Sequence, residues 1–334
     1  MQSANLYDRK AADNVVTVKR ARLISVGSYV PEQVMENCEF EQFLDTSNEW
    51  IVSRTGIKSR HITPKDMSAP ASYLGAVAAR IALERVQCAP EEIDGIICAT
   101  FTPDYFFPST ACKIQAELGC TTAFAFDVSA ACAGFIYALT LANTLIVSGQ
   151  CRKVLVVGAE VISKTLDWTD RSTCILFGDG AGAVLLEASE NENKGIQKAY
   201  LHSDGTLGDI LELPAWGENR TMKMKGNEVF KHAVRLMSEA ACKVMEGVGL
   251  SFDQLDYLIP HQANSRIIRA IAQQLNINED RVVCNVERFG NTSSASIPLA
   301  LDEIWSRNKI YEGKKVLLTA LGGGAAVGSV LIYF

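Results

Sequence analysis

Apolar positions along this chain follow helical spacing in three long segments. In residues 71–86 and 227–245 they recur every third or fourth residue, which predicts helices that pack on a core by one face. Residues 133–147 are apolar almost throughout and predict a helix buried on all sides. Thr140 and Asn143 interrupt that segment, and a membrane span needs about 20 mostly apolar residues. We therefore expect a core helix there and not a membrane span.

The shorter apolar runs recur as an internal repeat of the sequence. Residues 92–98 resemble residues 254–260, and residues 153–157 resemble residues 315–319, in both cases at an offset of 162 residues. Buried strands all tend to be Val/Leu/Ile-rich, but two matches at one offset favour a duplicated unit of strands and helices.

The repeat predicts two halves of an α/β protein. We place them at residues 19–190 and 191–334, after an N-terminal arm at residues 1–18. Residues 191–225 are rich in Gly and Pro and predict a connection or lid between the halves.

Composition narrows the class of protein. The chain has 334 residues, more than one core usually holds, with 48% hydrophobic and 21% charged residues;. Its net charge of −6 argues against a general nucleic-acid binder;. The first residues include acids and no apolar core, so we expect neither a signal peptide nor a transit peptide.

The ten cysteines contain no C-x-x-C pair, which argues against a zinc ribbon or a thioredoxin-like site. Without a secretory signal a disulfide framework is not expected either, and the chain is predicted to be cytoplasmic, in a reducing compartment.

Cys132 is the first candidate for chemistry. It lies in a run of small residues between a strand expected at 122–128 and the apolar helix at 133–147. A helix N-terminus favours a thiolate, and small neighbours let another molecule approach, so Cys132 is a candidate covalent nucleophile. The alternative is that it packs as a small hydrophobe, as most free cysteines do; only its flanking residues distinguish it.

His261 and Asn291 occupy similar places. His261 directly follows a strand expected at 256–259, where α/β sheets place their sites;. Asn291 follows a strand expected at 281–286, in a Gly/Ser/Thr turn where an Asn is usually only a turn or cap residue;. In a duplicated fold equivalent turns meet, which would bring both residues to Cys132. The other three histidines are expected to be structural or solvated.

Two glycine-rich turns complete the motifs. The glycine run at 322–324 follows a strand expected at 316–321 and is interpreted as backbone close to the thiol, offering an N–H to an oxyanion. The FGDGAG turn at 177–182 is interpreted as a tight turn between packed strands. A phosphate or nucleotide loop is the less favoured alternative for each.

Taken together, six motifs resemble the β-ketoacyl-acyl-carrier-protein synthase III family of the thiolase superfamily. They are NEWIVSRTG at 48–56, SAACAG at 129–134, FGDGAG at 177–182, HQAN at 261–264, GNTS at 290–293 and GGG at 322–324. The resemblance runs from about residue 20 to the last residue. It implies an α/β, thiolase-like, five-layered αβαβα fold of two duplicated halves, and a homodimer.

The resemblance also implies an activity. Cys132 would take an acyl group from acyl-CoA, and malonyl-acyl-carrier protein would lose CO2 and attack the thioester. The products would be 3-oxoacyl-acyl-carrier protein, CO2 and CoA, and the reaction would initiate fatty acid biosynthesis. Acyl-CoA and acyl carrier protein are then substrates. No cofactor, metal, membrane or nucleic acid is expected.

Residue roles follow from the same resemblance. Cys132, His261 and Asn291 would be catalytic, and the N–H groups of Cys132 and Gly323 would hold the acyl oxyanion. The remaining positions would bind CoA and pantetheine (Trp50, Arg54, Arg171, Asn227, Asn264), form the acyl site (Phe107 from the partner subunit, and Leu321) and contact the carrier protein (Lys231, Arg266, Arg269).

The chain departs from the family at two places. Gln273 and Gln274 stand where some relatives carry a basic pair, and Leu321 and Ala325 stand where relatives often have aromatic residues. The smaller groups leave the choice of acyl group open. Two alternatives remain: a condensing enzyme of secondary metabolism with a different acyl donor or acceptor, and a non-catalytic acyl-CoA or carrier-protein binding module, in which Cys132 would not be acylated.

Overall fold

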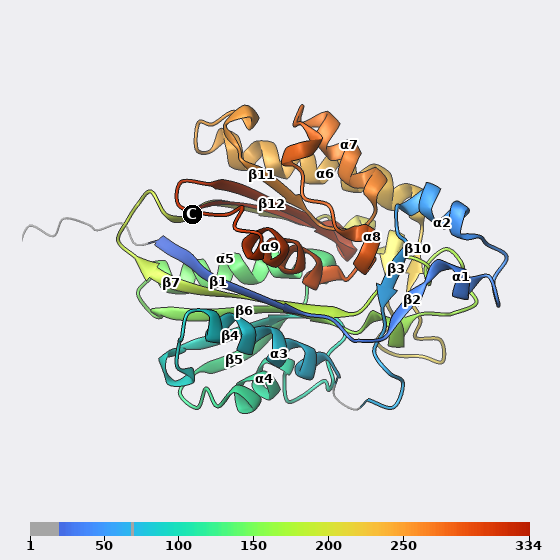
Figure 1. The fold of residues 1–334 in the computed structure, drawn as a ribbon, viewed down its shortest axis with the longest axis horizontal. Coiled ribbons are helices and arrows are strands. Elements are labelled where there is room, and N and C mark those ends of the chain that lie inside the picture. The colour runs from blue at the N-terminus through green and yellow to red at the C-terminus, as the bar shows by residue number, and fades with distance from the viewer. Residues whose placement is uncertain (1–19, 68–69) are drawn as a thin grey trace, which may run out of the picture.

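The chain folds into five layers, in which two sheets alternate with three layers of helices (Figure 1). A computed structural model describes residues 20–67 and 70–334, and the predicted arm at 1–18 lies outside them. The outer helices are α3 (Pro70–Arg85) and α4 (Thr110–Leu118) on one side, and α6 (Gly226–Glu246) and α7 (Ser265–Gln274) on the other; α5 (Gly134–Val147) and α9 (Ser296–Ser306) lie between the sheets. The predicted thiolase-like fold is confirmed.

The first sheet has the strand order β1-β7-β6-β4-β5. Its parallel strands are β4 (Gly95–Ala99), β5 (Phe124–Val128) and β6 (Lys153–Glu160), and the antiparallel strands β7 (Gly180–Ser189) and β1 (Arg20–Tyr29) complete it. Helices α3 and α4 bury Ala and Leu side chains against its outer face.

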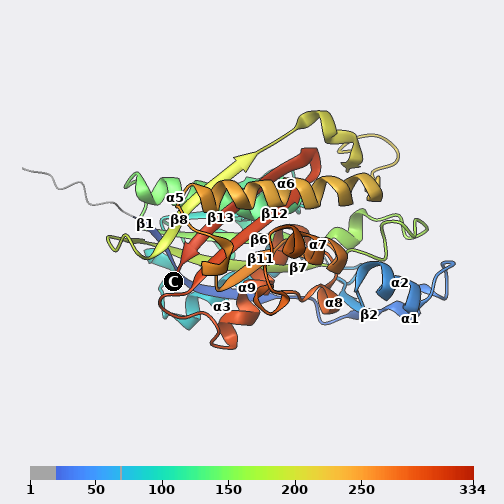
Figure 2. The same cartoon turned by 90° about the horizontal axis from the view of Figure 1, so that it is seen from above.

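The second sheet repeats this plan in the order β11-β12-β13-β8. Its strands are β11 (Tyr257–Pro260), β12 (Lys315–Gly322), β13 (Ala326–Tyr333) and β8 (Gly195–His202), and only the β11–β12 pair is parallel. Helix α6 lies across the outer face of this sheet (Figure 2).

One hydrogen-bond motif recurs in both sheets and accounts for the sequence repeat. The Asp94 carboxylate accepts from the Lys153 N–H at 2.9 Å, and the Asp256 carboxylate accepts from the Lys315 N–H at 2.9 Å. In each case the aspartate precedes one parallel strand and ties the start of its neighbour. The 162-residue offset therefore joins structurally equivalent strands.

The middle layer contributes to the largest hydrophobic core of the described residues. Helix α5 buries Phe135, Ile136 and Leu139 completely, between the inner faces of the two sheets. Helix α9 contributes Ile297 and Leu301 to the same core. The apolar run is therefore a core helix, but the prediction that it is buried on all sides is wrong, since Leu141 and Val147 are 41% and 42% exposed. No helix in the described ranges is long and apolar enough to cross a membrane.

Shorter elements gather at the end of the molecule where β5, β11 and β12 end and the loops of the candidate site begin. They are β2 (Val34–Glu36), α1 (Asn37–Phe40), α2 (Asn48–Thr55), β3 (Ser59–His61), β9 (Leu211–Glu212), β10 (Lys223–Met224) and α8 (Val286–Phe289). In Figure 1 they gather at the right-hand edge.

Two predicted segments differ from the structure. The strand expected at 281–286 is wrong: Val282 makes a single bridge to Leu258, and α8 begins at Val286. The connection expected at 191–225 is wrong for its first part, because residues 195–202 form β8 and pair with β13. The proposed boundary between halves falls in the link between β7 and β8.

Gly158 of β6 sets the distance between the two halves. A Cβ at this position would lie 2.5 Å from the backbone oxygen of Ser294, in the turn η7 (Ser293–Ala295). Contacts that short do not occur, so only glycine lets the turn of the second half rest on the strand of the first.

We predict that Gly158→Ala lowers the free energy of unfolding by about 2 kcal/mol, because overpacking against a fixed backbone atom forces the turn off the strand. Thermal and urea unfolding would measure the effect. Gly205→Ala is the control, since a Cβ there meets nothing within 4 Å. Equal midpoints for the two variants would contradict the close-packing argument.

Candidate active site

The three catalytic candidates line one cavity of about 500 Å³. Cys132 lies in the turn η2 (Ala131–Ala133) between β5 and α5, His261 directly follows β11, and Asn291 follows α8. All three side chains are buried, with at most 6% of each residue exposed. The structure thus brings together residues that are up to 159 positions apart in the sequence.

The nucleophile turn is held against the glycine run of the other half. A Cβ on Gly322 would lie 2.5 Å from the Ala130 oxygen and 2.9 Å from the Cys132 nitrogen. Ala131 adopts a left-handed backbone with φ of 45°, a conformation that costs a non-glycine residue about 1 kcal/mol. The expected close approach of this backbone to the thiol is present.

Burial controls the thiol itself. It raises the pKa of Cys132 to about 12, and the Ser293 hydroxyl opposes that rise while the Glu160 carboxyl adds to it. The expected lowering of this pKa is wrong for the free protein, because removal of the thiol from water outweighs the groups that favour the thiolate;. Cys132 is therefore a neutral thiol before substrate binds.

His261 is also neutral. Burial lowers the pKa of its imidazole to about 3. Its Nδ1 lies 2.7 Å from the Ser296 hydroxyl, which already accepts the Gln262 N–H at 3.3 Å. The Ser296 hydroxyl can donate its hydrogen to Nδ1, and in that arrangement the ring proton lies on Nε2. This tautomer makes Nε2 a hydrogen-bond donor.

The amide of Asn291 is oriented by the turn that follows it. Its Oδ1 accepts the Ser293 N–H at 2.8 Å, and its backbone is tied to the segment around Phe177 by Asn291 N–H to Leu176 O at 2.8 Å. With Oδ1 occupied, the NH2 group is the donor that remains for a ligand in the cavity.

A second cavity of about 240 Å³ meets the first at the thiol. Cys132 and Gly323 both line it, together with seven apolar residues and two polar ones: Phe101, Ala130, Ala131, Phe177, Leu211, Leu213 and Met222, and Ser129 and Glu212. The nucleophile therefore lies between a larger cavity with polar groups and a smaller apolar one, and Gly323 shares the latter with it.

The wider cavity carries positive charge. Arg54, Arg171 and Arg266 line it, and none of the described lining residues is Asp or Glu. The Arg171 guanidinium lies 4.7 Å from the centre of the Trp50 ring, and that of Arg54 lies 5.8 Å from it. This combination of a flat ring and forked cations suits a phosphorylated, aromatic ligand group.

The other predicted binding residues fall into two groups. Asn227, Asn264 and Leu321 line the cavity; the Asn264 amide also caps α7 and donates to the Arg54 oxygen at 3.2 Å. Lys231 and Arg269 are exposed on α6 and α7 and do not line it.

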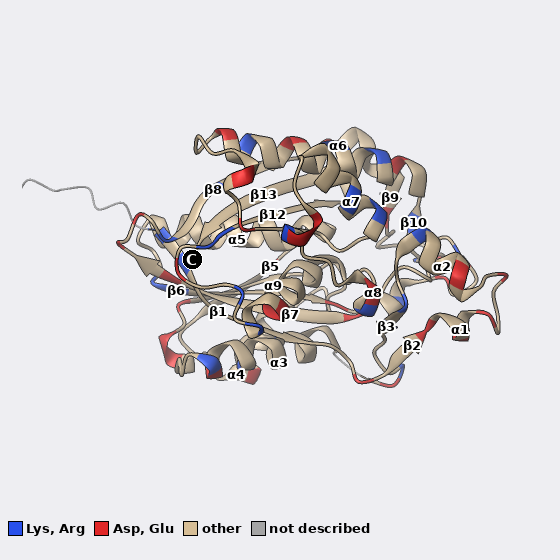
Figure 3. Cartoon of the chain, turned by 45° about the horizontal axis from the view of Figure 1, so that its top comes forward, with Lys and Arg blue, Asp and Glu red and all other residues tan. Residues whose placement is uncertain are grey.

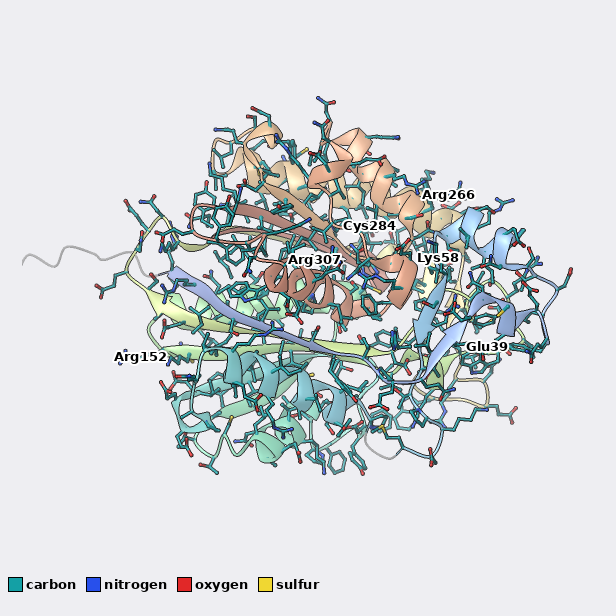
Figure 4. All side chains as sticks on the ribbon, in the orientation of Figure 1. Glu39, Lys58, Arg152, Arg266, Cys284 and Arg307 are labelled. Carbon is teal, nitrogen blue, oxygen red and sulfur yellow. The ribbon has the colours of Figure 1, made fainter. Side chains whose placement is uncertain are left out.

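Arg266 projects from the outer layer (Figure 4). The only charged residues of α7 are two arginines, whereas α6 carries both signs (Figure 3).

Phe107 is not part of the cavity of its own chain. It is 86% exposed, beside Phe106, whose ring stacks on Trp216 with centroids 5.2 Å apart. Exposed aromatic side chains that gather in this way are typical of protein interfaces.

Several residues that support the site were not predicted. Ser296 orients His261, Ser293 orients Asn291, and Glu160 acts on the thiol. A signal existed for Glu160 alone, as an acidic residue at the end of an apolar strand. The two serines lie within a polar, small-residue run that does not distinguish them.

The arrangement suits covalent acyl chemistry. A thiol can form a thioester, and two neutral donors can hold an oxygen that becomes negative, without removing a proton from a substrate. Within residues 20–67 and 70–334, no group of three His, Cys, Asp or Glu side chains is placed to hold a metal ion. All ten cysteines are free.

Comparison with known proteins agrees with this chemistry. Residues 126–205 match the family described as 3-oxoacyl-[acyl-carrier-protein (ACP)] synthase III, and residues 245–334 match its C-terminal domain. β-Ketoacyl-[acyl-carrier-protein] synthase III from Methylococcus capsulatus is 48% identical over 94% of this chain and 99% of its own length. The Roseobacter denitrificans protein of that name is 47% identical over 94% of this chain and 98% of its own.

A solved structure extends the comparison to the fold. The crystal structure of 3-oxoacyl-[acyl-carrier-protein] synthase III from Aquifex aeolicus superimposes with a TM-score of 0.90 at 45% identity, and covers 94% of this chain and 100% of that one. Near-full-length identity of this degree shows that the chain belongs to the β-ketoacyl-acyl-carrier-protein synthase III family of thiolase-fold condensing enzymes.

Proposed function

We propose that this protein condenses an acyl-CoA primer with malonyl-acyl-carrier protein and so initiates fatty acid biosynthesis. One observation carries the proposal: a cysteine thiol, a neutral imidazole and an oriented amide meet in a cavity lined by three arginines and no described acid. The names of the relatives, which are 46–48% identical over almost the whole chain, support the same reaction.

In the first half-reaction the Cys132 sulfur attacks the acyl-CoA carbonyl. The C–S bond to CoA breaks, CoA leaves as its thiol with the proton that Cys132 gives up, and an acyl thioester remains on Cys132. The N–H groups of Cys132 and Gly323 hold the carbonyl oxygen as it becomes negative. The smaller apolar cavity behind the thiol suits the acyl chain.

In the second half-reaction malonyl-acyl-carrier protein enters the wider cavity. Loss of CO2 leaves an enolate whose oxygen accepts from the His261 Nε2–H and the Asn291 NH2 group. The enolate carbon attacks the thioester and frees Cys132. Because CO2 departure creates the carbanion, the site needs donors and no general base, in agreement with the very low pKa of His261.

The remaining predicted roles belong to this proposal. Trp50, Arg54 and Arg171 bind the nucleotide end of CoA, Asn227 and Asn264 bind pantetheine, and Lys231, Arg266 and Arg269 contact the acidic carrier protein. Leu321, beside the thiol, contributes to the acyl site.

The quaternary structure and location are also proposals. We infer a homodimer in which Phe107 reaches the partner's acyl site, supported by the exposed Phe106, Phe107 and Trp216. Ten free thiols support a cytoplasmic location;. The proposed halves at 19–190 and 191–334 are supported by their large sheets: within the described residues the five-stranded sheet lies in the first half and the four-stranded sheet in the second.

We predict that Cys132 alone becomes acylated when the protein is mixed with acetyl-, isobutyryl-, octanoyl- or benzoyl-CoA. Intact-protein mass spectrometry should show one adduct of the acyl mass, absent from Cys132→Ala and present in Cys284→Ala, which removes an exposed cysteine. The preferred donor separates fatty acid initiation from a secondary-metabolite role. No adduct with any donor would favour the non-catalytic binding module.

We predict that Asn291→Ala separates the half-reactions. Loss of one donor to the enolate should slow CO2 release from malonyl-acyl-carrier protein on the order of 10²-fold, while the rate of Cys132 acylation stays within about threefold. Labelled CO2 release and rapid-quench mass spectrometry measure the two steps. Equal losses in both would show that Asn291 is not specific to the second step.

We predict that Arg171→Ala raises the KM for acyl-CoA about tenfold, because a charged contact to phosphate is worth roughly 1.5 kcal/mol or more. The KM for the matching acyl-pantetheine, which lacks the nucleotide, should not change. Arg269→Ala is the control, since that side chain is outside the cavity. A rise with both substrates would indicate a distorted site and not a lost nucleotide contact.

A further inference from the structure

Glu160 is a buried carboxyl group that the reaction above does not use, and it lies close enough to Cys132 for its charge to raise the pKa of the thiol. It is the last residue of β6 and has no exposed surface. Within the described part of the chain it has no ion-pair partner. A carboxylate that is fully buried without a cation is costly, so the group must be either neutral or well supplied with hydrogen-bond donors.

The donors around Glu160 are distributed unevenly over its two oxygens. Oε2 accepts from the Thr102 hydroxyl at 2.7 Å, from the Thr100 hydroxyl at 3.2 Å and from the Phe101 N–H at 3.2 Å. Oε1 contacts the Ser294 hydroxyl at 2.9 Å. The two oxygens therefore have different environments: Oε2 is an acceptor of three hydrogen bonds, and Oε1 is the oxygen that could carry a proton.

Counting hydrogens decides which oxygen carries the proton. Ser294 Oγ lies 2.8 Å from the carbonyl oxygen of Ala99 and 2.9 Å from Glu160 Oε1, and a hydroxyl has one hydrogen. Both contacts are hydrogen bonds only if Ser294 donates to Ala99 and Glu160 donates its own O–H to Ser294. A carboxylate would leave two acceptors competing for one hydrogen.

Ser293 connects this carboxyl to the thiol. It is 1% exposed, it adopts a left-handed backbone with φ of 50°, and its Oγ has no protein hydrogen-bond partner of normal geometry. The hydroxyl nevertheless lies close enough to lower the pKa of both Cys132 and Glu160. The turn η7 thus places one mobile hydroxyl between the two groups.

We propose that Glu160 holds a proton on Oε1 and, by remaining uncharged, allows Cys132 to form a thiolate; when Glu160 ionises, its negative charge suppresses that thiolate. Glu160 touches no substrate in this scheme and is a positioning residue that acts through Cys132. That control of the Cys132 thiolate matters for catalysis rests on the proposed function, in which Cys132 is the nucleophile.

The effect of Glu160 on the thiolate can be observed because Glu160 ionises within a pH range in which the protein can be studied. Burial raises its pKa to about 7, and the nearby hydroxyls of Thr102, Ser294 and Ser293 and the Phe101 N–H oppose that rise. The titratable groups that face it are Cys132 from η2 and Cys98 from β4, and the thiol pKa of each is raised, by burial first and in part by Glu160. His261 does not titrate in this range, since its pKa is about 3.

Glu160→Gln is the informative variant. The amide keeps a carbonyl for the three donors at Oε2, and its NH2 group replaces the O–H that contacts Ser294, so the neutral state is mimicked and cannot ionise. Asp179→Asn is the matched control: Asp179 is also a buried carboxyl, but its partners are Ser163 and Thr63 and it does not act on the thiol.

The measurement is the rate at which iodoacetamide alkylates Cys132 from about pH 5.5 to about pH 9, a range that brackets the ionisation of Glu160. Peptide mass spectrometry follows Cys132 separately from the exposed Cys38 and Cys284. In the wild type the logarithm of the rate should rise with pH, rise less steeply across the Glu160 pKa (the flat region below), and then return to its first slope. In Glu160→Gln it should rise without the flat region.

The two proteins should react equally at the acidic end, and Glu160→Gln should be faster by about threefold or more at the alkaline end, where one negative charge has been removed. Asp179→Asn should keep the flat region. A constant ratio of wild type to Glu160→Gln across the range overturns the proposal. If Glu160→Gln does not fold, the wild-type profile decides: a line without a flat region overturns it, and a flat region supports it.

This test is independent of the proposed function, because alkylation needs neither acyl-CoA nor carrier protein. If Cys132 shows the flat region but forms no acyl adduct, the condensation proposal fails while the effect of Glu160 stands. If the adduct forms and the flat region is absent, the condensation proposal stands and the proposed effect of Glu160 fails.

Discussion

Direct contact between the backbones of the two halves is the constraint on which the site depends. Gly158 lets the η7 turn rest on β6, and Gly322 lets the end of β12 rest on the nucleophile turn η2. No side chain fits at either contact. The two contacts bring the loops that carry Cys132, His261 and Asn291 into one cavity. The site therefore depends on Gly158 and Gly322, which allow these contacts, as well as on its reactive residues.

Removal from water sets the charge of every group in this centre. Cys132, His261 and Glu160 are each buried, and burial is the largest cause of the pKa shift of each, upward for the two acids and downward for the imidazole. The result is a site without fixed charge around the thiol, ringed at its mouth by arginines. Such a site holds neutral donors ready for an oxygen that becomes negative only during the reaction.

The duplicated plan explains why the site lies where it does. Asp94 and Asp256 make the same hydrogen bond in the two sheets. In the second half, His261 follows β11, and the glycine run at the end of β12 packs on the nucleophile turn. The second half differs from the first where function requires it. Residues 281–286 form a bridge and a short helix in place of an edge strand, and the chain turns from there into Asn291.

The sequence by itself predicted the three long helices, the strands of the repeat, the duplication and the candidates Cys132, His261 and Asn291, because each leaves a local pattern: an apolar period, a repeat offset or a motif beside a strand. The short helices α1, α2 and α8 and the helix α4 were not predicted. Tertiary structure alone decided the pairing of β8, the place of Glu160 and Ser293, and the charge of the thiol. The helix end next to Cys132 suggested a lowered pKa, but the pKa depends on how much water reaches the sulfur. That quantity is fixed by residues from both halves and by their packing, and no local pattern records it.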